Sequence, residues 1–179
     1  MSRAFVGEDS NASADDEAPE LKVPIPPGSR NYLTPEGAAA LADGLRRLEL
    51  EERPALAREV DRLSKDPGAR DALSAARRAL ARADRRLEYL SRMAALAEAV
   101  EPPPSGYDRV RFGATVVVTD SGGRMRRYRI VGVDEASPDR GSIGWTSPVA
   151  RALMGRKPGD RVTARLPAGD EEFTVVSVE

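Results

Sequence analysis

The sequence predicts an α+β protein in which an antiparallel coiled-coil hairpin precedes a small, mostly antiparallel sheet domain with one short helix. Three observations lead to this prediction. Apolar residues between positions 33 and 100 recur at alternating steps of three and four, which is the spacing of a coiled-coil seam. A proline-rich linker follows at residues 101–107. Beyond it, over residues 108–179, apolar residues alternate with a period of two, which is typical of strands.

The composition excludes several classes of chemistry. The chain of 179 residues contains no Cys and no His, so disulfides, Cys/His zinc sites, thiol catalysis and Ser-His triads are excluded. No apolar run is long enough to cross a membrane and the N-terminus lacks a signal-peptide core. We therefore expect a cytoplasmic protein with no membrane partner. The net charge of −1 gives no global attraction to nucleic acid.

The first 32 residues read as a disordered acidic tail. They are rich in small and acidic residues, with prolines near the end. Such a segment cannot bury enough apolar surface to offset its chain entropy.

Helix signals begin directly after the tail. Thr34 is a favourable cap, Pro35 suits the first turn, and Glu36 is favoured at the positive end of the helix dipole. This first helix is predicted to run to about Ser64. Pro54 lies inside it and removes one hydrogen bond, so a kink or break is expected there.

A tight turn over residues 65–68 (Lys-Asp-Pro-Gly) separates this helix from a return helix predicted from about Ala69 to Val100. A second apolar strip near the end of the return helix suggests that the base of the hairpin packs on the next domain. The seam of the return helix comprises Leu73, Ala76, Leu80, Ala83, Leu87, Leu90, Ala94 and Ala97.

The sheet domain is predicted to contain six short strands and one helix. Ser147 and Pro148 open a helix over Pro148–Met154, which Gly155 closes. Turn residues separate the strands. The predicted strands are Val110–Phe112, Thr115–Thr119, Arg126–Val133, Ser142–Trp145, Arg161–Leu166 and Glu172–Val178.

Several short motifs carry a family resemblance. In the sheet domain they are Phe112-Gly113-Ala114, Tyr128-Arg129-Ile130-Val131-Gly132 with Asp134-Glu135, Ser147-Pro148, Ala150-Arg151-Ala152-Leu153, Gly159-Asp160 and Pro167-Ala168-Gly169. In the arm they are Leu33-Thr34 with Gly37, Glu52-Arg53-Pro54, and Asp84-Arg85-Arg86-Leu87 with Tyr89-Leu90. Together they resemble the bacterial GreA/GreB transcription elongation factors, in the arm especially the GreB-like branch. The resemblance covers about residues 33–179.

The resemblance implies a mechanism in which the protein is a regulator and not an enzyme. A C-terminal domain with an FKBP-like fold would dock on RNA polymerase at the rim of its secondary channel, and the coiled coil would enter the channel near the transcript RNA. Acidic residues at the tip would help to hold a second Mg²⁺ in the polymerase's own active site, which then cleaves backtracked transcripts. We expect a monomer without a tightly bound cofactor, associated with the nucleoid through the polymerase. Docking is assigned to Trp145, Ser147, Pro148 and Arg151, with core packing as the alternative role of Trp145.

The tip departs from the family pattern, which reads roughly Gly-Asp-x-x-Glu-Asn-Ala-Asp/Glu-Tyr. Here residues 64–73 contain no Asn or Tyr, and only Asp66 and Asp71 supply carboxylates. These two aspartates are the candidates for assisting the polymerase's Mg²⁺. Their alternative roles are local, because Asp66 suits a turn and Asp71 suits the first turn of a helix. A channel-occupying regulator that does not stimulate cleavage is therefore an equal alternative.

The return helix also carries an outward stripe of cations with Tyr89 among them, which would suit the phosphates of a transcript. The alternative is a solvated coiled-coil face with acidic partners nearby. Two further function classes stay open, a coiled-coil adaptor without a polymerase link and an FKBP-like prolyl isomerase. Few aromatic residues are available to floor a proline pocket, which argues against the isomerase. The stripe comprises Arg78, Arg82, Arg85 and Arg92.

Overall fold

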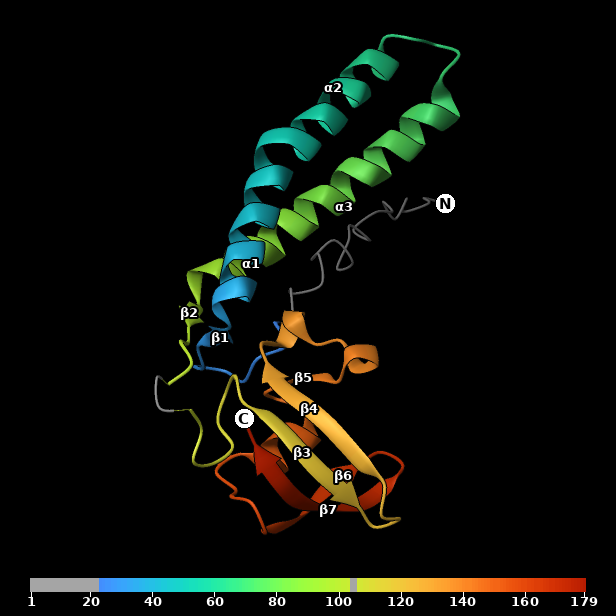
Figure 1. Cartoon of the computed structure of the whole chain (residues 1–179). Helices are drawn as coiled ribbons and strands as arrows, with labels where there is room; N and C mark the ends of the chain where they lie inside the picture. The colour runs from blue at the N-terminus through green and yellow to red at the C-terminus, as the bar shows by residue number, and fades with distance from the viewer. Residues whose placement is uncertain (1–22, 104–105) are drawn as a thin grey trace, which may run out of the picture.

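A long helical hairpin rises from one end of a small five-stranded sheet domain (Figure 1). The structure is a computed structural model that describes residues 23–103 and 106–179. The predicted α+β architecture of a helical arm followed by a mostly antiparallel sheet is confirmed. Most of the predicted tail and part of the predicted linker lie outside the described residues.

The first half of the arm is one helical rod with a π-helical segment inside it. It consists of α1 (Pro35–Arg47), η1 (Leu48–Glu52) and α2 (Arg53–Ser64). The Arg53 N–H bonds to the Leu48 carbonyl five residues earlier, directly before Pro54, which has no N–H to donate. Arg47 and Glu52, also five residues apart, form an ion pair at 2.8 Å. The break considered at Pro54 does not occur: the helix continues, and a π-helical segment lies directly before Pro54.

The second half of the arm is α3 (Arg70–Ala95), which returns antiparallel to α2 (Figure 1). Its expected continuation to Val100 is wrong, because β2 (Ala97–Ala99) follows and pairs in parallel with β1 (Asn31–Leu33). The buried Asn31 explains this end: its N–H bonds to the Leu96 carbonyl at 2.8 Å and its Nδ2 to the Met93 carbonyl at 3.1 Å. The expectation of a disordered tail up to residue 32 is wrong for the described residues 23–32, because Ile25 is buried and β1 begins at Asn31.

The sheet has the strand order β5-β4-β3-β7-β6, and only β4 and β5 pair in parallel. A register shift between β3 and β7 at Val117/Val118 interrupts the ladder. The helix α4 (Pro148–Leu153) begins at Ser147, whose Oγ accepts from the Ala150 N–H at 3.2 Å. Aliphatic side chains and Phe173 form the core together with α4. The strands are β3 (Thr115–Asp120), β4 (Met125–Val131), β5 (Ser142–Gly144), β6 (Arg161–Leu166) and β7 (Gly169–Val178).

Four strand predictions in this domain need correction. The strand expected to reach Trp145 ends at Gly144, and the strand expected to begin at Glu172 begins at Gly169. Val110–Phe112 is not a strand, since Val110 is buried and exchanges hydrogen bonds with the loop after α4, at Gly155 and Arg156. The strand expected to continue to Val133 ends at Val131, and the 3-10 turn η2 (Val133–Glu135) follows. Another 3-10 turn, η3 (Pro138–Arg140), precedes β5. The first of these turns faces the base of the arm.

Candidate functional site

The turn at the tip of the arm holds Asp66 and Asp71 in different settings. Asp66 Oδ1 accepts a hydrogen bond from the Gly68 N–H at 2.9 Å, which gives Asp66 the predicted role in the turn. Asp71 lies in the first turn of α3, where the helix dipole favours a carboxylate. Both side chains are exposed. In the described part of the chain, no group of three or more acidic side chains could hold a metal ion by itself.

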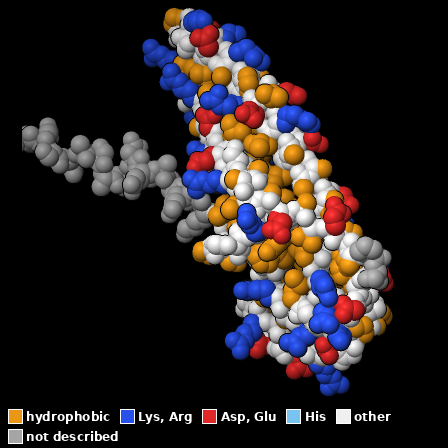
Figure 2. Space-filling view, turned by 90° about the vertical axis from the view of Figure 1, so that its left-hand side faces the viewer, with side chains coloured by type: hydrophobic (Ala, Val, Ile, Leu, Met, Phe, Trp, Pro, Cys, Tyr) orange, Lys and Arg blue, Asp and Glu red, His pale blue; other side chains and the backbone are white. Residues whose placement is uncertain are grey.

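The four arginines of the predicted stripe are all exposed on α3. Arg78 donates to Ser74 Oγ at 2.7 Å, and Arg92 pairs with Glu88 at 2.7 Å. The expectation that Tyr89 belongs to this outward surface is wrong, because its hydroxyl donates to Asp134 Oδ1 of the sheet domain at 2.7 Å. Figure 2 shows that Lys and Arg side chains gather toward the free end of the arm on the face it displays. The RNA-facing role of the arginines stays a prediction.

Of the residues assigned to polymerase docking, Trp145 has a packing role. Its ring meets Tyr32 of β1 edge-on at a centroid distance of 5.5 Å and packs against the sheet core. Pro148 and Arg151 are exposed on α4. Arg151 lines a polar groove of about 630 Å³, and the other two arginines of that groove are Arg156 and Arg161. Two carboxylates, Asp120 and Glu172, line the same groove, so its charge is mixed with a small excess of positive charge.

A carboxylate that the sequence did not single out joins the arm to the sheet domain. Glu135, at the end of η2, accepts hydrogen bonds from the N–H groups of Thr34 at 3.0 Å and Gly132 at 2.9 Å, and from the Thr34 hydroxyl. The Thr34 hydroxyl oxygen also accepts from the Gly37 N–H at 3.0 Å, which caps α1. The cap of the arm and the turn of the sheet domain thus share one hydrogen-bond network.

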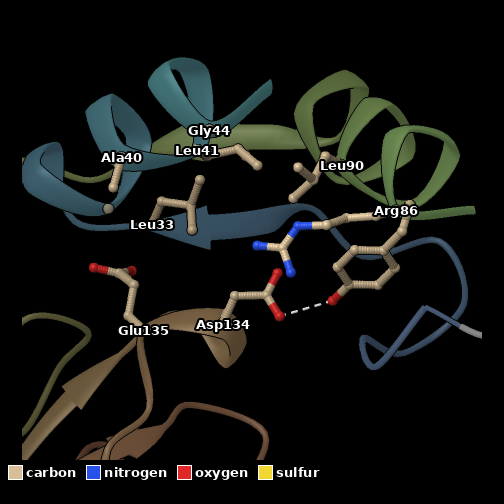
Figure 3. A pocket seen from close by; sticks show the side chains of 10 residues that line it. Leu33, Ala40, Leu41, Gly44, Arg86, Leu90, Asp134 and Glu135 are labelled. Atoms are coloured by element: carbon tan, nitrogen blue, oxygen red, sulfur yellow. Dashed lines mark hydrogen bonds between the residues drawn. The ribbon is translucent and has the colours of Figure 1, made fainter. Parts of the chain in front are cut away.

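A cavity of about 440 Å³ lies beside this network, between α1, α3 and η2 (Figure 3). Its walls are apolar at Leu41 and Leu90 and polar at Arg86. Tyr89 and Asp134 both line it, and the Tyr89 hydroxyl donates to Asp134 Oδ1. Partial burial and then this hydrogen bond raise the pKa of Tyr89 above its ordinary value. The hydrogen bond between Tyr89 and Asp134 is therefore a second contact that holds the arm on the sheet domain.

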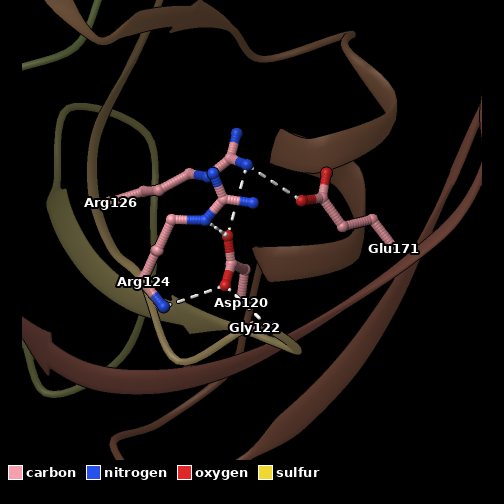
Figure 4. Close-up of polar contacts among 5 residues, drawn as sticks. All are labelled: Asp120, Gly122, Arg124, Arg126 and Glu171. Carbon is pink, nitrogen blue, oxygen red and sulfur yellow. Dashed lines mark hydrogen bonds and ion pairs between the residues drawn. The ribbon is translucent and has the colours of Figure 1, made fainter.

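The β3–β4 hairpin contains a buried carboxylate that holds its turn. Asp120 Oδ1 accepts from the N–H groups of Gly122 and Arg124, both at 2.9 Å (Figure 4). Its Oδ2 lies 3.3 Å from Arg126, which also reaches Glu171 at 3.2 Å. These donors, with the Arg124 N–H foremost, lower the pKa of Asp120. Asp120 is therefore ionised and fully bonded, so we assign it a structural role.

Glu135 and Asp134 illustrate what the sequence reasoning missed. In the sequence both residues belong to a family motif, and no local pattern assigns them a structural role. Thr34 was recognised as a helix cap, but its second partner lies 101 residues away. The local signal in the sequence is Gly37, a glycine in the first turn of a helix, three residues after its cap.

These observations define a protein in which a helical arm is joined to a sheet domain by several contacts at its base, through Glu135, Tyr89 and Tyr32 among others. The family model for the C-terminal part of transcription elongation factors GreA/GreB matches residues 104–179. The chain is 35% identical over 154 residues to transcription elongation factor GreB of Neisseria meningitidis serogroup A. The matched region covers 84% of this chain and 94% of that relative. The chain therefore belongs to the GreA/GreB family of transcription elongation factors.

Relatives with both names match at similar identity. Transcription elongation factor GreA of Anaeromyxobacter sp. (strain K) is 38% identical over 149 residues, which covers 82% of this chain and 90% of that relative. The crystal structure of GreA factor homolog 1 of Thermus thermophilus is similar over 84% of this chain and 99% of that chain, with 27% identity and a TM-score of 0.40. The assignment to a GreB-like branch stays a prediction. Within residues 23–103 and 106–179, no helix is long and apolar enough to cross a membrane.

Proposed function

We propose that this protein binds RNA polymerase through its sheet domain and inserts the arm into the secondary channel of the enzyme. The observation that supports this most is the arm itself, which projects away from the sheet domain and ends in an exposed turn with two carboxylates (Figure 1). The contacts at its base, those through Glu135 and Tyr89 among them, favour a fixed direction of projection. The protein would act on the polymerase's active site and would have no catalysis of its own.

The tip could assist transcript cleavage only with ligands supplied by the polymerase. Asp66 and Asp71 would be the residues that contact the second Mg²⁺, which when bound supplies Lewis-acid activation of a water. Two carboxylates fit a shared metal completed by another protein, but they are too few for a metal held by this chain alone. Asp66 already uses one oxygen in the turn, so its other oxygen is the one available to a metal.

Occupation of the channel without cleavage is the second candidate. The hydrogen bond from the Gly68 N–H to Asp66 favours this candidate, because Asp66 could contact a metal only in an orientation that keeps the turn intact. An anionic surface of the polymerase would suit the groove of Arg151, Arg156 and Arg161 in either case.

A transcript-cleavage assay on backtracked polymerase complexes separates the two candidates. If cleavage is stimulated, the double variant Asp66→Ala/Asp71→Ala should lose at least tenfold of that stimulation, and Asp61→Ala should keep it as a matched control on the arm. If the wild type binds the polymerase without stimulating cleavage, the channel-occupying function holds. A pull-down that recovers no RNA polymerase would contradict both and leave the adaptor class, and a prolyl-isomerase assay checks the remaining alternative.

A further inference from the structure

One face of α3 carries cationic side chains that no acidic side chain of residues 23–103 or 106–179 neutralises. Arg78, Arg82 and Arg85 are spaced four and three residues apart, so they lie on the same face of the helix, and all three are exposed. Among the described residues, none of the three has an acidic partner within salt-bridge distance. We call these three residues the arginine face.

The acids of α3 that lie nearest are already paired. Asp84 is 2.7 Å from Arg53 of the facing helix α2, and Glu88 is 2.7 Å from Arg92. Within the part of the chain that the structure describes, the only partner of Arg78 is the hydroxyl of Ser74, at 2.7 Å. The arginine face is therefore free to bind an anion from elsewhere.

The same chain contains a polyanion of matching charge. Residues 1–22 lie outside the part of the chain that the structure describes, but their sequence is strongly acidic. Its only basic residues are Arg3 and Lys22. The acidic residues of this N-terminal segment are Glu8, Asp9, Asp15, Asp16, Glu17 and Glu20.

The attachment point brings this segment within reach of the arginine face. The Asn31 N–H bonds to the Leu96 carbonyl, so the chain enters the fold beside the end of α3. Along the helix, Arg85 and Arg78 lie about 17 Å and 27 Å from Leu96 at 1.5 Å per residue. Residues 23–30 are placed in the fold, with Ile25 buried, so the reach is set by the chain before Val23. The stretch from Asp16 to Val23 can span up to about 24 Å, and the stretch from Glu8 to Val23 up to about 50 Å. The first acidic residues of the segment therefore have the longest reach toward the arginine face.

We propose that in the free protein the acidic segment of residues 8–20 binds the arginine face of α3 and shields it from other anions. Each exposed ion pair is weak, but a covalently attached segment acts at an effective concentration in the millimolar range. The inference goes beyond the proposed function, because it concerns the free protein and requires no polymerase. Its consequence is that any polyanion, a transcript included, must displace the segment before it contacts these arginines.

A spin label tests where the segment binds. The chain has no Cys, so Ser10→Cys provides a single site for a nitroxide. We expect the label to broaden the amide signals of residues 76–87 in α3. The broadening should disappear in 1 M salt, where the screening length falls to about 3 Å, and when the six acidic residues of the segment are replaced by Asn and Gln.

Three results of this experiment would overturn the proposal. The first is the absence of broadening on α3. The second is broadening centred on the groove of Arg151, Arg156 and Arg161, which would place the segment on the sheet domain. The third is broadening that appears only between a labelled and an unlabelled molecule, which would show that a second copy is the partner.

Binding of a fluorescent 20-nucleotide oligouridylate tests the shielding. Deletion of residues 1–20 should tighten binding about three- to tenfold at low salt, as expected when a competing segment covers most of the site. In the Arg78→Gln/Arg82→Gln/Arg85→Gln background the deletion should give a much smaller gain. The matched control Arg151→Gln/Arg156→Gln/Arg161→Gln should keep the full gain. An unchanged affinity on deletion would show that the segment does not shield the arginine face. An equal gain in both triple variants would show that the segment acts only through net charge, and either result contradicts the proposal.

Discussion

Replacement of Gly37 by Ala should destabilise the protein, although the same change usually stabilises a helix. In a helix interior, Ala is favoured over Gly by about 0.8–1 kcal/mol. A Cβ on Gly37, however, would lie 2.2 Å from Cδ and Oε1 of Glu135, which is far inside contact distance. The carboxylate of Glu135 would have to move away from the start of α1.

The magnitude follows from the hydrogen bonds that this movement breaks. The carboxylate accepts from the N–H groups of Thr34 and Gly132 and from the Thr34 hydroxyl. Hydrogen bonds to charged groups contribute about 1.5–3 kcal/mol each, and the lower end suits a half-buried site. Loss of two of them, offset by the gain in helix propensity, gives a net destabilisation of about 1–3 kcal/mol.

Urea unfolding followed by circular dichroism at 222 nm measures this effect. Gly44→Ala is the matched control, because it lies in the same helix and a Cβ there has no atom within 4 Å. The control should be stabilised by up to about 1 kcal/mol. In a Glu135→Ala background, Gly37→Ala should lose its cost, since the clashing side chain is gone. The reasoning fails if Gly37→Ala is as stable as Gly44→Ala.

Two further predictions concern ionisable groups. Because the pKa of Asp120 is lowered in the fold, its contribution to stability is present above its unfolded pKa of about 3.9 and is lost as the pH falls below that value. Asp120→Asn should therefore flatten this part of the profile of urea midpoint against pH. An unchanged slope would contradict the structural role assigned to Asp120. Tyr89→Phe should cost about 0.5–1.5 kcal/mol in urea unfolding through loss of the hydrogen bond to Asp134. Because the pKa of Tyr89 is raised, the contribution of Tyr89 to stability should persist up to about pH 10 and be lost above that pH. In an ultraviolet titration, the variant should lack the last tyrosine to ionise. Loss of a tyrosine that ionises early would refute the contact between Tyr89 and Asp134.

Local patterns were enough to predict most of the elements. The steps of three and four placed the two halves of the arm, although the helix continues through Pro54 with a π-helical segment before it. Thr34 and Ser147 were recognised as helix caps because capping depends on a few adjacent residues. The turn residues and the alternation of period two placed β6 with its observed bounds.

The candidate site was predictable only in part. The tip aspartates have the local roles expected of them, and the four arginines are exposed as predicted. Trp145 shows the limit of such reasoning, since its role depends on whether another segment covers its ring. Tyr32 of β1 does so, and no pattern near either residue indicates it.

Helices, turns and strands whose causes lie within a few residues can be predicted from local sequence. The way in which the arm is held depends on contacts that only the folded chain shows. The parallel pair of β1 and β2, the bonds of Glu135 to Thr34 and the bond of Tyr89 to Asp134 all join residues far apart in the chain. Tyr89 has the spacing of an outward residue, yet it points to the sheet domain because Asp134 lies there. Such contacts depend on how two separately formed elements pack, and local spacing carries no information about that arrangement.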